Sequence, residues 1–110
     1  MTITPSTPSL LANDHGLYLA TVADALDAVG SGLPGCVFTQ ADFHPGLFDL
    51  RNGLAGEVFQ KFTNYNFRAA FVLPSDHGYG DRVTELIREH KRSSSVRFFE
   101  SIEDAAAWLK

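Results

Sequence analysis

The sequence predicts one α/β domain, in which short apolar strands alternate with amphipathic helices. Two apolar runs, residues 36–38 and 67–73, are flanked by Gly or Pro and are typical of buried strands. Residues 55–62 repeat apolar side chains at helical spacing. The 110 residues suit a single domain. This alternation favours a mostly parallel sheet with right-handed crossovers, of about four or five strands and about four helices.

The first third of the chain is expected to hold a leader, a short strand and a helix. Residues 1–9 are rich in Thr, Ser and Pro and have the composition of a loose N-terminal leader. Residues 9–12 include two leucines and predict a short first strand. Thr21 and Asp24 form a capping-box pattern for a helix that ends at Gly30. Spacing predicts its inward face as Val22, Leu26 and Val29.

The middle of the chain is expected to hold the most regular helix and the central strand. A loop over residues 42–50, which carries His44-Pro45-Gly46, leads to this helix. Its apolar face is predicted as Ala55, Val58, Phe59 and Phe62. Residues 67–73 are nearly all apolar after Arg68, so this strand should be covered on both sides. Pro74 ends it, because proline cannot donate to a strand ladder.

Two more helices and one strand complete the prediction. Asp81 is expected to cap a third helix, whose inward face is Val83, Leu86, Ile87 and His90. Residues 96–99 form a last strand. Ser101 caps the last helix, with Ile102, Ala105, Trp108 and Leu109 facing inward. We interpret four basic residues as cations that stabilise the C-terminus of the third helix: Arg88, Lys91, Arg92 and Arg97.

Composition narrows the classes of function. The formal net charge is -4, which argues against nucleic-acid binding, since that needs a basic surface. Cys36 is the single cysteine, so we expect a buried, inert thiol and no intramolecular disulfide. We find no run of about 18 apolar residues and no secretory signal pattern, and therefore expect a cytoplasmic protein that does not enter a membrane.

Residues 48–65 carry a family resemblance. They read FDLRNGLAGEVFQKFTNY and resemble a family of small bacterial proteins defined only as a domain of unknown function. That resemblance extends loosely over residues 17–109. Within it, Asp49 followed by Gly53-Leu54-Ala55-Gly56 is similar to the Asp-Ser-Ser-Gly-Leu-Gly motif of STAS domains, the sporulation anti-sigma-factor antagonists. The resemblance implies a STAS-like sheet and a regulatory switch at the start of the second helix.

Asp49, Arg51, Asn52, Gly53 and Gly56 are the candidate site residues. In the antagonists a kinase phosphorylates the Ser that precedes the glycine, and the matching position here is Asn52, which has no hydroxyl. Read from the residues alone, Asn52 is a helix N-cap, and the two glycines let the helix pack closely against a strand or ligand. The other interpretation is an anion or partner site at a helix N-terminus.

Two functions follow from these patterns. The first is a non-enzymatic regulatory or protein-interaction module that binds another protein, and a homodimer is compatible with it. The alternative is a small-ligand-binding protein or minor enzyme that uses the loops 42–52 and 75–81. The observation that distinguishes these two functions is whether the loops line one pocket with convergent polar groups, as a ligand-binding protein or enzyme requires. No catalytic set, metal site or cofactor motif is recognised in the sequence.

Overall fold

The computed structural model describes residues 10–109, and it is an α/β fold with a three-stranded parallel sheet. The strands β1 (Gly35–Phe38), β2 (Arg68–Val72) and β3 (Val96–Phe99) lie in the order β1-β2-β3, so β2 is central as predicted. The predicted leader, residues 1–9, lies outside the described residues. The four α-helices are α1 (Val22–Val29), α2 (Leu54–Asn64), α3 (Asp81–Glu89) and α4 (Ile102–Leu109).

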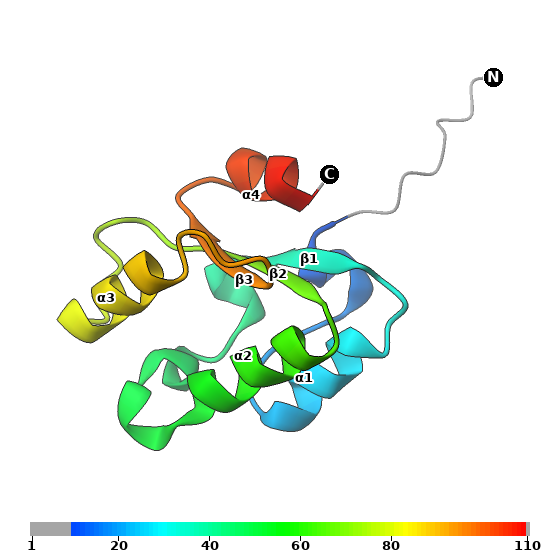
Figure 1. Cartoon of the computed structure of the whole chain (residues 1–110), viewed down its shortest axis with the longest axis horizontal. Helices are drawn as coiled ribbons and strands as arrows, with labels where there is room; N and C mark the ends of the chain where they lie inside the picture. Colours follow the sequence, from blue (N-terminus) through cyan, green and yellow to red (C-terminus); the bar gives the residue numbers. More distant parts are fainter. Residues whose placement is uncertain (1–9, 110) are drawn as a thin grey trace.

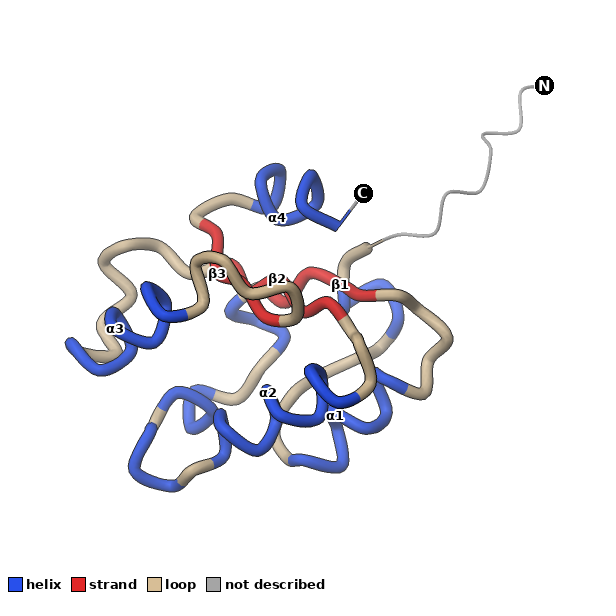
Figure 2. Tube along the Cα trace, viewed as in Figure 1, coloured by secondary structure: helices blue, strands red, loops and turns tan. Residues whose placement is uncertain are grey.

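The helices cover the sheet unequally. In Figure 1, α1 and α2 lie below the sheet and α4 lies above it. The core residues of α1, α2 and α3 belong to one apolar cluster, whereas Ala105 of α4 belongs to a second cluster with Val37 and Ala70. Three short 3-10 turns separate β1 from α2 (Figure 2). Those turns form the first of the two loops that the sequence singled out.

Phenylalanine rings fill the larger core. Phe71 of the central strand lies 5.3 Å from Phe38 and 5.5 Å from Phe98, ring centroid to ring centroid. Phe59 of α2 lies 5.4 Å from Phe71. Aromatic pairs at these separations add about 0.5–1.5 kcal/mol each beyond the area they bury. The predicted inward face of α2 is confirmed, because Ala55, Val58, Phe59 and Phe62 are all buried.

The number of strands is smaller than predicted. The described residues contain three strands instead of four or five. The predicted first strand is reduced to a parallel bridge between Leu11 and Val37, beside the outer edge of β1. A 3-10 turn begins directly afterwards, at Ala12, which cuts the pairing short. A STAS-like strand count therefore does not appear in this part of the chain.

The helix ends confirm some details and correct others. Thr21 and Asp24 make the predicted capping box, and Ser101 accepts the Asp104 N–H at 3.1 Å. Asp81 is the first helical residue of α3, and Gly80 is the N-cap, so that cap prediction was wrong. Two inward assignments were also wrong, because Leu26 and Ile102 are 43% and 41% exposed. Ala25 and Ala28 are the buried residues of α1 instead.

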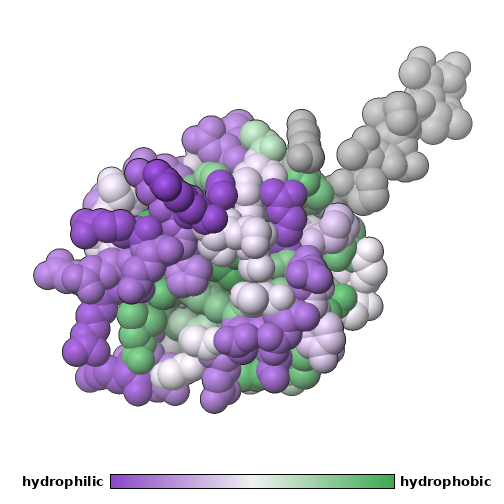
Figure 3. Space-filling model, viewed as in Figure 1, coloured by the Kyte–Doolittle hydropathy of each residue, from purple (hydrophilic) through white to green (hydrophobic). Residues whose placement is uncertain are grey.

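The surface of the molecule is mixed in character. On the face seen in Figure 3, hydrophilic residues lie over α3 on the left, and hydrophobic residues show in the hollowed middle. Among the helices of residues 10–109, none has the length and hydropathy that a membrane span requires.

Candidate functional site

The two loops singled out in the sequence meet at one edge of the sheet. One follows β1 and the other follows β2, and parallel strands end at the same edge. Between them lies a cavity of about 520 Å³, which we call the loop hollow. Its lining is Pro45, Phe48, Asp49, Leu50, Arg51, Gly78, Tyr79, Gly80, Asp81, Arg82 and Val83. Open α/β sheets generally bind ligands at this edge.

An ion pair stands at the rim of the loop hollow. The guanidinium of Arg51 donates from Nε and Nη2 to the two carboxylate oxygens of Asp49, at 2.9 and 3.1 Å. Hydrogen bonds from Arg51 lower the pKa of Asp49, and the same contact raises the pKa of Arg51. The Arg51 side chain is 85% exposed, so this pair adds little to stability. It does hold the guanidinium in place at the rim.

Asn52 has a structural role that the sequence described only in part. Its side-chain oxygen accepts the Leu54 N–H at 2.8 Å, and its amide nitrogen donates to the Gly46 carbonyl at 3.0 Å. The N-cap of α2 is Gly53, so the prediction of Asn52 as the N-cap was wrong by one position. Asn52 ties the turn after β1 to the start of α2. An aspartate there would lose the donor to Gly46.

The two glycines of the motif do not pack closely against anything. A Cβ placed on Gly53 or on Gly56 would have no neighbour within 4 Å, so the prediction of close packing was wrong. Gly53 is needed because its φ of 73° is left-handed. Gly56 has no such requirement. Both glycines line a second, shallower hollow of about 720 Å³, together with Val22, Glu57, Gln60 and Lys61. The five predicted site residues are therefore not gathered at one place.

The second loop is held in shape by His77. Its Nδ1 accepts the backbone N–H of Tyr79 at 3.0 Å, and its Nε2 lies 3.1 Å from the Thr84 hydroxyl in α3. Because Nδ1 accepts, the neutral ring carries its proton on Nε2 and donates to Thr84. The Tyr79 ring stacks on His77 at 5.7 Å and lies 5.5 Å from Phe48. Tyr79 thus forms an aromatic wall of the loop hollow.

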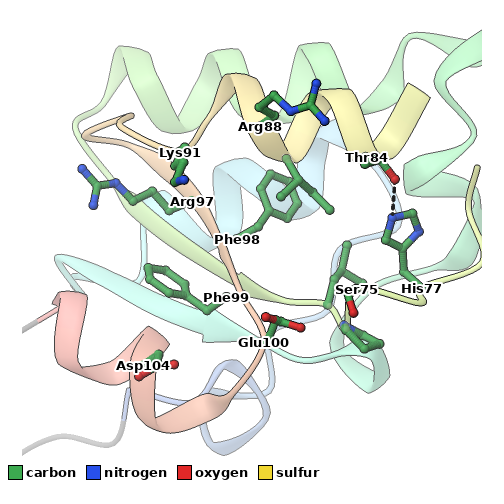
Figure 4. Close-up of a pocket in the computed structure, with 13 residues that line it drawn as sticks. Ser75, His77, Thr84, Arg88, Lys91, Arg97, Phe98, Phe99, Glu100 and Asp104 are labelled. Carbon is green, nitrogen blue, oxygen red and sulfur yellow. Dashed lines mark hydrogen bonds between the residues drawn. The ribbon is translucent and has the colours of Figure 1, made fainter. Parts of the chain in front are cut away.

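A third cavity runs along the outer edge of β3 between α3 and α4 (Figure 4). We call this cavity of about 580 Å³ the edge groove. Its apolar floor includes Ile87, Phe98 and Phe99, and its charged residues are Arg88, Lys91, Arg97, Glu100 and Asp104. Figure 4 shows Phe98 directed toward α3 and Phe99 directed toward α4. The groove thus combines apolar surface with charges of both signs.

Comparison with known proteins assigns the family. Residues 6–109 match the family model described as a domain of unknown function, DUF4180. The chain belongs to the DUF4180 family. It is also 25% identical over 103 residues to the 5′-nucleotidase SurE of Nitrosomonas europaea. That match covers 87% of this chain, which spans only 42% of the nucleotidase's length. No solved structure matches the chain.

Cys36 of this DUF4180 chain is buried, as predicted. Burial and, as the smaller cause, the nearby charge of Asp42 together raise the pKa of its thiol to about 12. A thiol that is protonated at neutral pH is a poor nucleophile. Asp42 is itself buried and accepts hydrogen bonds from the N–H and hydroxyl of Thr39, both at 2.8 Å. In the described part of the chain, no three acidic, His or Cys side chains form a metal-binding group.

The sequence did not reveal the edge groove as a site. The basic residues Arg88, Lys91 and Arg97 were identified, but they were assigned to a helix C-terminus. Their assembly with Phe98 and Glu100 depends on how α3 and α4 flank β3, which no local pattern encodes. One signal was present: the strand 96–99 carries a charged residue between apolar ones, as edge strands commonly do.

Proposed function

We propose that this chain is a binding module that takes up a small phosphorylated molecule in the loop hollow. The observation that carries the proposal is that both loops, separated in sequence by α2 and β2, line one cavity. Its volume of about 520 Å³ falls within the ordinary range of ligand pockets. This supports the ligand-binding alternative drawn from the sequence, which required the loops to meet around polar groups.

The charges at the rim suit a phosphate. Arg51 comes from the loop after β1, Arg82 comes from the first turn of α3, and both line the hollow. Arginine binds phosphate oxygens with paired donors, which makes such contacts stronger than single hydrogen bonds. Asp49 is already paired with Arg51, whereas Asp81 opposes an anion. A ligand therefore gains most from Arg82, and it would bind more tightly if the charge of Asp81 were removed.

The wall of the hollow suits a planar ring. Tyr79 and Phe48 both line the cavity, and an aromatic face favours stacking. A nucleoside monophosphate joins a planar base to a phosphate. The name of the Nitrosomonas relative, a 5′-nucleotidase, points to the same class of molecule. We therefore propose nucleoside monophosphates as the first ligands to test.

Titration of the purified chain with adenosine and guanosine monophosphates tests this proposal. We expect saturable binding by calorimetry that weakens about tenfold in Arg82→Ala and strengthens in Asp81→Asn. Arg92→Ala is the matched control, because Arg92 is exposed and does not line the loop hollow. Absence of binding at about 1 mM ligand, or equal losses in the Arg82 and Arg92 variants, would refute the proposal.

A second candidate function is a protein-interaction surface at the start of α2. An exposed glycine inside a helix costs about 1 kcal/mol relative to alanine, and neither backbone conformation nor contacts explain Gly56. We propose that a partner covers the hollow beside Gly53 and Gly56, as in a STAS-like regulatory module of the bacterial cytoplasm. The phosphorylatable serine of such modules is replaced by Asn52. Asp49 and Arg51 would then connect the ligand to the partner surface.

Substitution of Gly56 tests the interaction surface. Gly56→Gln places a side chain in the hollow without changing the charge, and Gln60→Ala enlarges the hollow by shortening one of its lining side chains. Affinity capture from the native cell, with quantitative mass spectrometry, should yield a protein that is lost with Gly56→Gln. An exposed substitution outside the hollow, Glu85→Gln, is the control. If the same proteins are captured by all variants, the surface at α2 is not an interaction site.

A further inference from the structure

The two outer edges of the sheet differ in their backbone pairing. Beside β1, the segment at Leu11 bridges to Val37, and the Val37 N–H donates to the Leu10 carbonyl. Within residues 10–109, β3 pairs only with β2. The edge groove runs along the unpaired side of β3. An unpaired edge presents a row of backbone donors and acceptors, which can template pairing with another strand.

The hydrogen bonds between β2 and β3 identify which backbone groups face the open edge. The Ser95 carbonyl accepts the N–H of Ala69 in β2 at 2.7 Å, and the Phe99 carbonyl accepts the N–H of Leu73, directly after β2, at 2.9 Å. Backbone direction alternates along a strand, so Arg97 also bonds toward β2 and Phe98 points its N–H and C=O outward. The Phe98 side chain is only partly buried. This residue therefore lies at the centre of the available edge.

Side chains alternate in the same way between the two faces. Val96 and Phe98 pack in the cluster under α3, whereas Phe99 packs with Trp108 of α4. Arg97 lies on the α4 side, 5.2 Å from the Trp108 ring. Glu100 follows directly after the end of β3 and also lines the groove. Charged residues of both signs thus line the open edge.

These charges are arranged in a self-complementary way. Arg88 and Lys91 precede β3 on the α3 side, and Glu100 follows the end of β3. On the α4 side, Arg97 lies within β3 and Asp104 lies in the first turn of α4. Among the described residues, none of these five side chains is in an ion pair with another. Cations therefore lie toward one end of the groove and acids toward the other.

We propose that the edge groove is a homodimer interface, in which β3 strands of two copies pair antiparallel around Phe98. Antiparallel pairing turns the second copy end to end, so its acidic end meets the basic end of the first. Lys91 and Arg88 then face Glu100 of the second copy, and Arg97 faces the acidic start of the second copy's α4. An acidic peptide would match only the cations, whereas a second copy matches both ends. The three-stranded sheet becomes six-stranded across a two-fold axis.

Sedimentation equilibrium of the full-length chain tests this interface. We expect a mass near twice the 12.0 kDa of one chain at about 100 μM. Glu100→Lys and Lys91→Glu should each raise the dimer dissociation constant about tenfold, since each places like charges face to face. The double variant Lys91→Glu with Glu100→Lys should restore dimerisation, because the two charges are exchanged. Glu85→Lys, outside the groove, is the matched control.

The results of these experiments either support or overturn the proposed dimer interface. Restored dimerisation in the double variant, with slowed hydrogen exchange of the Phe98 amide in the dimer, supports it. A monomer at about 100 μM overturns it, as does a dimer unaffected by both single charge reversals. Circular dichroism of each variant separates loss of dimer from loss of fold. The proposal is independent of ligand binding in the loop hollow, so nucleotide affinity of the Glu100→Lys monomer is expected to match that of the native chain.

Discussion

Helices α2 and α3 contribute to the same apolar cluster but are anchored very differently. Helix α2 buries Ala55, Val58, Phe59 and Phe62, whereas the only fully buried residue of α3 is Val83. The single side chain of Phe59 contacts four rings, those of Phe48, Phe71, Phe98 and His90. The side chains of Leu86 and Ile87 in α3 are only partly buried. One helix is part of the core, and the other rests at its margin.

This difference coincides with the positions of the cavities. Helix α3 and its preceding loop contribute residues to both the loop hollow and the edge groove. Elements with few buried apolar contacts open more readily, and binding regions are commonly drawn from them. We therefore expect stability to depend mainly on α2 and ligand-linked motion to be confined mainly to α3.

The largest expected effect is the loss of Phe59. Phe59→Ala removes a buried ring from the centre of the aromatic core and should cost about 3–5 kcal/mol. Val83→Ala, the matching truncation at the anchor of α3, removes two methyl groups and should cost about 2 kcal/mol. Urea unfolding of both variants measures the difference. Equal losses would contradict the distinction between the two helices.

The sequence predicted α2 and the three strands well because their patterns are local. The spacing of Ala55, Val58, Phe59 and Phe62 fits one helical face, and the apolar run 67–73 could only be a covered strand. It misplaced Leu26 because the buried residues of α1, a helix that packs against α2, are the small Ala25 and Ala28. Close helix approach favours small side chains, and a pattern based on large apolar residues misses it.

The candidate site was less predictable because it depends on tertiary packing. The loops 42–52 and 75–81 were identified as candidate ligand-binding loops, and they do meet. Asn52 was recognised as a hydrogen-bonding residue at the helix start, but its bond to the Gly46 carbonyl depends on a turn that the sequence does not reveal. Arg82 was not singled out, since an exposed arginine in the first turn of a helix carries no pattern of its own.

The second-largest expected effect is a difference between α2 and α3 in how readily each helix opens locally. Amide hydrogens of α3 should exchange at least about tenfold faster than those of the buried turns of α2, because α3 can detach without disrupting the phenylalanine core. Hydrogen exchange read by NMR measures this directly. A saturating nucleoside monophosphate should slow exchange at the start of α3, next to Arg82, and leave α2 unchanged. Equal protection in the two helices would show that α3 is an integral part of the core.

The smallest effect separates the two glycines at the start of α2. Both would place a Cβ in open space, so the substitutions differ only in the backbone. Gly53→Ala forces alanine into a left-handed conformation at φ 73° and should cost about 1–2 kcal/mol. Gly56→Ala lies in regular helix and should stabilise the chain by about 0.5–1 kcal/mol. Opposite signs in urea unfolding would show that Gly53 is kept for its conformation and Gly56 is not. Because stability then disfavours glycine at position 56, the proposed partner surface would explain the glycine, whereas a destabilising Gly56→Ala would remove that explanation.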